Sequence, residues 1–149
     1  MSCCLPSSGV PSGLRFVNSA NTARGDSSIP SSRRVYFAIF FPESEDAQPA
    51  YFFFDRTKPT LCVVEQATRY AGLQMDRGRL AGSPEKLNLF TIEGEVLRTD
   101  LEIDAHLGGA LHPSSVLLLE KGNRVSESRL ETIRQAAALQ TSGSVCVLL

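Results

Sequence analysis

The order of apolar segments predicts an α+β fold, in which a mixed β-sheet packs on one main helix. Three observations support this expectation: two neighbouring runs of β-branched and aromatic residues, one helical stripe of apolar residues, and two later apolar runs separated by turns. These segments fall within residues 35–122. We therefore expect one domain there, a disordered Ser- and Gly-rich arm over residues 1–34, and a helix with a flexible tail over residues 123–149.

The first two strands are predicted from residue type. Val35–Phe41 is β-branched and aromatic and is followed by Pro42, and Tyr51–Phe54 has the same character. The polar residues 43–48 between them predict a hairpin loop. Both runs are apolar on both faces, so we expect one face to cover a core and the other to be incompletely solvated.

The main helix is predicted to follow the loop at residues 55–59. Thr60 stands in the N-cap position, and Gly72 stands where helices commonly end. One apolar stripe lies between them, formed by Val63, Val64, Ala67, Tyr70 and Ala71. Residues 74–85 contain Gly78, Gly82 and Pro84 and are predicted to form a loop.

The later strands are predicted within residues 86–121. The run from Leu87 to Leu97 comes first, as a strand, the turn at Glu93-Gly94 and a short strand. A helical turn within residues 100–107 and a final strand at residues 114–120 follow. Two-residue alternation predicts side chains that face the helix and side chains that face away from it. We expect Leu87, Leu89, Val116 and Leu118 to face the helix, and Asn88, Phe90, Leu117 and Leu119 to face away from it.

The outward row, Asn88, Phe90, Leu117 and Leu119, is the candidate partner-binding site, because an exposed Phe beside two Leu side chains favours protein association. An alternative stays open. Ser128-Arg129-Leu130-Glu131 has a capping-box pattern and predicts a helix through Ile133, Ala136, Ala137 and Leu139. That helix could cover the row and form a second core.

Composition argues against several functions. The formal net charge of −1 does not favour nucleic acid, and no apolar run approaches the roughly 20 residues of a membrane-spanning helix. The cysteines and histidines lack the spacing of a zinc site, so we expect neither metal nor cofactor. An enzyme built on Cys62 with His106 or His112 lacks a nucleophile–base motif. We therefore expect a monomeric, cytoplasmic protein that is not an enzyme.

The order of elements over residues 35–122 predicts a β-grasp. Within it, a set of apolar spacings resembles ubiquitin-like domains, and most of all the C-terminal domain of AN1-type zinc-finger proteins of the arsenite-inducible, stress-granule group. The residues that carry this resemblance are Phe53-Phe54-Asp55, Leu87-x-Leu89-Phe90, Gly94-x-x-Leu97, Gly109-x-Leu111 and Val116-x-Leu118-Leu119-Glu120.

The resemblance implies a non-catalytic interaction module that docks onto the segregase ATPase of the ubiquitin system or onto the proteasome. The sequence departs from the family in two respects. The Cys and His ligands of the AN1 zinc finger have no counterpart here, and Lys121-Gly122-Asn123 follows the final strand where a protein modifier would carry a terminal Gly-Gly.

The two ends of the sequence suggest targeting. Cys146-Val147-Leu148-Leu149 fits a prenylation box, with residues 141–144 as a flexible approach, and Cys3 and Cys4 could carry palmitate. The alternative function is therefore a prenylated, membrane-anchored ubiquitin-fold protein that recruits a ubiquitin-pathway enzyme to membranes. The arginines and serines of residues 1–34 also match the composition of a transit peptide.

Overall fold

A computed structural model describes residues 23–45, 47–112 and 115–147 of the chain. The described elements form an α+β domain that confirms the predicted fold class. In chain order they are a 3-10 turn Ser31–Arg33, β1 Arg34–Phe40, β2 Ala50–Asp55, α1 Leu61–Ala71, β3 Met75–Asp76, β4 Arg79–Leu80, β5 Leu87–Thr91, α2 Ile103–His106, β6 Val116–Lys121 and α3 Glu127–Val147.

The main sheet has four strands in the order β2-β1-β6-β5. The outer pairs, β1 with β2 and β5 with β6, are antiparallel, whereas the central pair of β1 and β6 is parallel. The sheet is therefore mixed, as predicted. β3 and β4 form a separate two-stranded hairpin.

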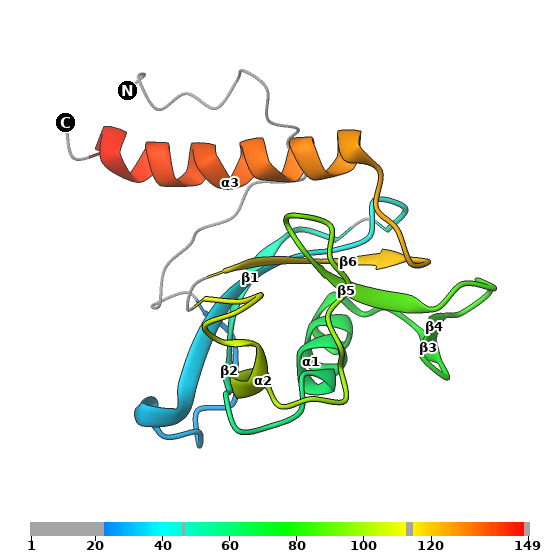
Figure 1. Ribbon diagram of the computed structural model, residues 1–149, viewed down its shortest axis with the longest axis horizontal. Helices are drawn as coiled ribbons and strands as arrows, with labels where there is room; N and C mark the ends of the chain where they lie inside the picture. Colours follow the sequence, from blue (N-terminus) through cyan, green and yellow to red (C-terminus); the bar gives the residue numbers. More distant parts are fainter. Residues whose placement is uncertain (1–22, 46, 113–114, 148–149) are drawn as a thin grey trace.

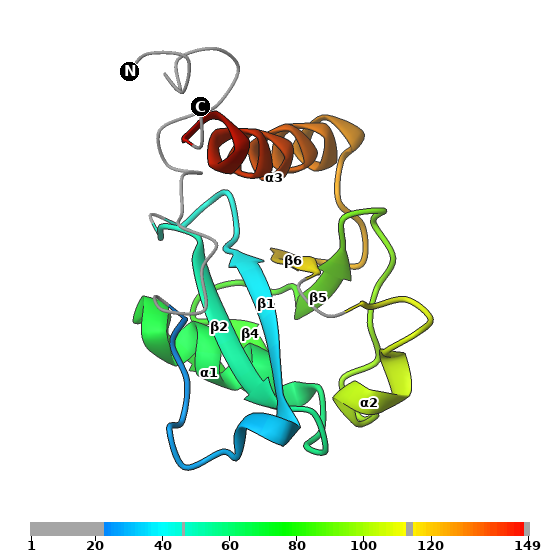
Figure 2. The same ribbon diagram turned by 90° about the vertical axis from the view of Figure 1, so that its left-hand side faces the viewer.

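The sheet lies between two helices (Figures 1 and 2). α1 covers one face and α3 covers the other, so the domain has three layers. Apolar side chains fill the space on both sides of the sheet. We call the cluster on the α1 side the α1 core and the cluster on the α3 side the α3 core.

The predicted helix at residues 61–71 is confirmed as α1, and Val63 and Ala67 are fully buried in the α1 core. Gly72 ends it at φ 72°, a left-handed conformation that glycine adopts without a Cβ penalty. Thr60 does occupy the N-cap position, but its hydroxyl donates a hydrogen bond to the Leu101 carbonyl (2.7 Å) in place of capping the helix. Thr60 thus ties the start of α1 to the segment before α2.

Two details of residues 74–97 differ from prediction. The expected loop contains the β3–β4 hairpin, whose tip places Arg77 and Gly78 at positive φ (55° and 82°), as a tight two-residue hairpin turn requires. The short strand expected after the Glu93-Gly94 turn is reduced to a single bridge between Phe90 and Val96. In both places the backbone pairing extends over one or two residues a side, which is too short to leave an alternating pattern in the sequence.

α3 begins earlier and ends later than predicted. It starts at Glu127, and the Ser126 hydroxyl accepts the Arg129 backbone N–H (3.2 Å), so the capping residue is Ser126 and not Ser128. The helix continues to Val147, and the prediction of a flexible linker at residues 141–144 is wrong. Extending an existing helix adds one hydrogen bond for each residue ordered, and this propagation accommodates weak helix formers such as Gly143. In the described part of the chain no helix is long and apolar enough to cross a membrane.

The predicted disordered arm is wrong for residues 23–34, because residues 23–33 lie against the edge of the sheet and Arg34 begins β1. Residues 1–22, including Cys3 and Cys4, lie outside the described residues.

Candidate interaction surfaces

The predicted partner-binding row is not an exposed surface. Phe90, Leu117 and Leu119 have no solvent-exposed area. Asn88 is half-buried, and its amide donates a hydrogen bond to the Gly122 carbonyl (2.7 Å). Leu117 and Leu119 belong to the α1 core, whereas Phe90 belongs to the α3 core. The prediction of an outward apolar patch is therefore wrong. The alternative, in which the C-terminal helix covers the row and forms a second core, is correct about the second core, but Phe90 is the one member of the row that belongs to it.

The error lies in the phase of β6. The antiparallel register sets Leu119 opposite Leu89 and Leu118 opposite Phe90, and residues directly opposite one another share a face of the sheet. β6 therefore turns Leu117 and Leu119 toward α1, and it turns Leu118 toward α3. The run Val116–Leu119 is apolar at every position, so its own sequence carries no alternation from which this phase could be read.

α3 makes close apolar contact with the sheet. Its buried side chains, Leu130, Ile133 and Ala136, lie one helical turn apart and pack in the α3 core. The turn after β5 comes near as well, because a Cβ built on Gly94 would lie 2.9 Å from Leu130 Cδ1. The φ of Gly94 is 90°, so both its conformation and its space favour glycine.

A largely buried ion pair fixes the start of α3. Arg129 Nε lies 3.1 Å from Glu120 Oε2 on β6, and the same guanidinium donates a hydrogen bond to the Phe41 carbonyl (2.8 Å). Glu120 also accepts the Glu43 backbone N–H (3.0 Å). Burial nevertheless raises the pKa of the Glu120 carboxyl above its ordinary value, against the opposing effects of these hydrogen bonds and of Arg129.

A second surface lies along β2, the strand at one edge of the sheet. Residues 23–33, which we call the strap, cross the outer side of β2. The Arg24 N–H donates to the Tyr51 carbonyl and the Arg24 carbonyl accepts the Phe53 N–H, both at 2.9 Å. Arg24 and Phe52 thus form a parallel β-bridge. The strap adds a single residue of strand pairing to an edge strand.

Side chains strengthen this contact. The Arg24 guanidinium of the strap lies 4.6 Å from the ring centre of Tyr70 on α1. Beside the strap, the guanidinium of Arg34, the first residue of β1, lies 4.3 Å from the ring centre of Phe53 on β2. Gly25 passes so close to β2 that an added Cβ would lie 2.6 Å from the Phe53 carbonyl oxygen. Because the obstacle is backbone, a larger residue at position 25 would have to move the strap away from β2.

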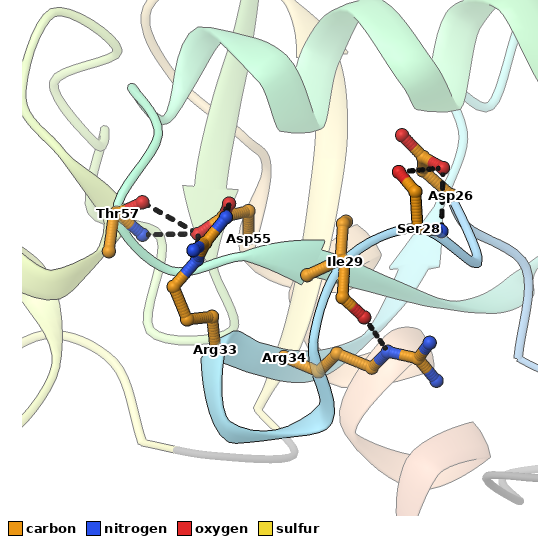
Figure 3. Close-up of polar contacts among 7 residues, drawn as sticks. All are labelled: Asp26, Ser28, Ile29, Arg33, Arg34, Asp55 and Thr57. Carbon is orange, nitrogen blue, oxygen red and sulfur yellow. Dashed lines mark hydrogen bonds and ion pairs between the residues drawn. The ribbon is translucent and has the colours of Figure 1, made fainter.

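Polar contacts hold the second half of the strap (Figure 3). Arg33 and Thr57 converge on the Asp55 carboxylate at the end of β2, with Arg33 Nη2 at 2.8 Å and the Thr57 hydroxyl at 2.7 Å. The Arg33 and Thr57 hydrogen bonds keep the pKa of Asp55 well below its usual range. Arg34 donates to the Ile29 carbonyl (2.8 Å), and the side chain of Ile29 is buried.

Two hollows lie along the strap beside α1. One, of about 460 Å³, is lined by Arg24, Gly25, Asp26, Phe52, Gln66, Arg69 and Tyr70. The other, of about 360 Å³, is lined by Asp26, Ser28, Ile29, Arg33, Asp55, Lys58, Cys62 and Gln66. Asp26 and Gln66 border both hollows, which therefore adjoin one another along the strap.

The candidate catalytic residues and the candidate lipidation site lie on different elements of the structure. Cys62 is half-buried on α1, and burial raises the pKa of its thiol, which opposes formation of a nucleophilic thiolate. His106 Nε2 contacts the Arg98 carbonyl (2.9 Å), and His112 lies exposed in the segment before β6. Among the described residues no group of three or more metal-ligating side chains could hold an ion. Cys146 falls in the last turn of α3, and its prenylation stays a prediction.

No protein-family model matches the chain, and no curated protein matches it. Among solved structures, the chain is similar to a chain of the toluene 4-monooxygenase HD complex with the inhibitor 4-bromobenzoate. The two share 16% identity over 59% of this chain and 98% of the other, with a TM-score of 0.44. A likeness this weak supports no conclusion about fold or activity.

Proposed function

We propose that the chain is a non-catalytic protein-interaction module with a ubiquitin-like β-grasp fold. The strand order β2-β1-β6-β5, with a parallel central pair and α1 across one face, is the observation that carries the proposal. In such a fold an N-terminal hairpin, a helix and a returning final strand enclose one core. Function then depends on the surface, because this scaffold serves many roles.

The proposed partners are components of the ubiquitin system, either its segregase ATPase or the proteasome. The resemblance of residues 35–122 to the ubiquitin-like domain of AN1-type proteins supports this choice. α3 occupies the face of the sheet that carries Phe90, so docking uses the surface that remains accessible. That surface includes three large apolar side chains that are nearly half exposed, Leu61 and Tyr70 on α1 and Val96 beside β5.

The test is direct binding of the full-length chain to the purified segregase ATPase and to purified proteasome, measured by biolayer interferometry. We expect saturable binding to one of the two. Tyr70→Ala and Val96→Ala report which side of the domain contacts the partner, and Gln135→Ala, on the exposed side of α3, is the control. Absence of binding to both, by a chain that shows a cooperative thermal transition, would exclude these partners.

A further inference from the structure

We propose that the groove between the edge of β2 and α1 is a docking site for an extended segment of a partner protein, and that the strap occupies this site in the absence of the partner. The expected ligand has an Arg or Lys followed directly by Gly. It adds to β2 as a parallel strand. This inference rests on the proposed interaction function and names the site and the chemistry of its ligand.

The first step is the open edge. β2 stands at the end of the strand order, so one side of its backbone has no neighbour within the sheet. Edge strands with free backbone groups pair readily with extended peptides. The strap already demonstrates such pairing through Arg24, but only at one position, whereas β1 on the other side pairs with β2 from Arg34 to Ile39. The backbone pairing of the strap to this edge is therefore short, and a segment that replaced the strap would meet the same two groups of β2, the Tyr51 carbonyl and the Phe53 N–H.

The second step is the chemistry of the ligand, which the strap itself displays. The face of Tyr70 accepts the guanidinium of Arg24, and Tyr70 is 44% exposed even with the strap in place. The next position has no room for a side chain, because the Phe53 carbonyl would lie 2.6 Å from a Cβ. A cation followed by glycine is therefore the pair that this part of the groove selects.

The third step is that the strap leaves space around itself. The two hollows, of about 460 and 360 Å³, adjoin it along its α1 side. Arg24, Gly25 and Asp26 are exposed, and within the described part of the chain the first half is anchored to β2 by the two backbone hydrogen bonds to Tyr51 and Phe53. The buried Ile29 and the Arg33–Asp55 pair hold the second half. The first half can thus exchange with a competing segment while the second half stays attached.

The experiment displaces the strap in the full-length chain and supplies the segment in trans. Gly25→Val forces residue 25 away from β2, and Gly109→Val is the control, because a Cβ there meets nothing closer than the His106 carbonyl at 3.6 Å. The probe is a fluorescein-labelled peptide with the sequence of residues 20–27, which contains the Arg-Gly pair and stops before Ile29, observed by fluorescence polarisation. Amide hydrogen exchange of Phe53 reports whether the β2 edge is paired.

We expect the Phe53 amide to exchange at least tenfold faster in Gly25→Val than in the wild-type chain or in Gly109→Val. The peptide should bind Gly25→Val at least tenfold more tightly than it binds either of these and restore the protection of Phe53. A peptide carrying Val at the glycine position should not bind. Arg24→Ala is a second variant, which loosens the strap without a steric clash and should bind the wild-type peptide with an intermediate affinity.

Three results would overturn the proposal. The first is fast exchange at Phe53 without peptide binding in a folded Gly25→Val or Arg24→Ala chain. The second is unchanged protection of Phe53 in both variants. The third is a wild-type dimer in light scattering that Gly25→Val abolishes, because the groove would then hold the strap of a second copy. Peptide binding is measured without the segregase ATPase or proteasome, so a failure of those partners leaves the groove result standing.

Discussion

The two faces of the sheet differ in how their apolar cores are built. The α1 core draws on β1, β2, β4, β5, β6, α1 and α2, so its side chains come from most of the chain. The α3 core joins the same sheet to one helix, and that helix supplies three buried apolar side chains, Leu130, Ile133 and Ala136. The first core defines the domain, whereas the second attaches a helix to it.

The buried polar groups on the two sides of the sheet also differ. On the α1 side, Thr60 is fully buried and bonds to a backbone carbonyl, an arrangement that leaves no charge in the core. On the α3 side, Arg129 and Glu120 bring two charges to the edge of the core, and charges removed from water lose solvation that their pairing must offset. We therefore expect α3 to open at a lower free energy than the sheet and α1.

The largest expected effect is in the α1 core. Phe37 has no exposed area and contacts Phe54 across the β1–β2 pair, with ring centres 6.1 Å apart. Phe37→Ala removes this ring from the core and should lower the global free energy of unfolding by about 3–5 kcal/mol. Urea denaturation followed by circular dichroism measures the change. Loss of α3 alone, with the sheet intact, would contradict the assignment of Phe37 to the defining core.

A smaller and more local effect is expected in the α3 core. Ile133 is fully buried between α3 and the sheet, and Ile133→Ala should weaken this contact by about 2 kcal/mol. Amide exchange should accelerate throughout α3 while the amides of β1 and β6 keep their protection. Gln135→Ala, on the exposed side of the same helix, is the control. Equal acceleration in β1 would show that α3 and the sheet unfold as one unit.

The α1 side was also the more predictable side from sequence. The existence of β1, β2, β5 and α1 follows from residue type, and the inward phase of Leu87 and Leu89 follows because Asn88 separates the two leucines. The phase of β6 could not be read from four consecutive apolar residues. It depends on the pairing with β5, and such a contact between distant segments leaves no local pattern.

The order of the strap cannot be predicted from its sequence for a related reason. Its composition is that of a disordered segment, and its order comes from contacts with β2 and α1, which lie 27 to 46 residues later in the sequence as the pairs Arg24–Tyr51 and Arg24–Tyr70 show. Arg-Gly followed by an Asp-x-Ser turn is the signal that was available. The covered sheet face, in contrast, was one of two alternatives that the capping box and the apolar spacing of residues 130–136 left open.

The contributions of Glu120 and Asp55 to the stability of the fold should change with pH in opposite directions. Burial raises the pKa of Glu120 in the folded chain, so between the ordinary glutamate value of about 4.3 and the raised value the folded state binds the proton more strongly than the unfolded state does. The contribution of Glu120 to stability therefore falls as pH rises through this interval. Glu120→Gln should flatten that part of the stability profile from urea titrations. Parallel profiles for wild type and variant would show that Glu120 ionises normally.

Asp55 should give the smallest effect, confined to acid. Its pKa lies well below the ordinary aspartate value of about 3.9, so its contribution is fully present above that value and is lost as pH falls toward the folded-state pKa. Arg33 is half exposed, and water screens its attraction to Asp55, so Asp55→Asn, whose amide oxygen can still accept the Thr57 hydrogen bonds, should change stability little at neutral pH. The variant should instead lose the acid-dependent part of the profile below about pH 4. Arg33→Gln should shift that part toward higher pH, because the Thr57 hydrogen bonds alone lower the pKa less than the full set does.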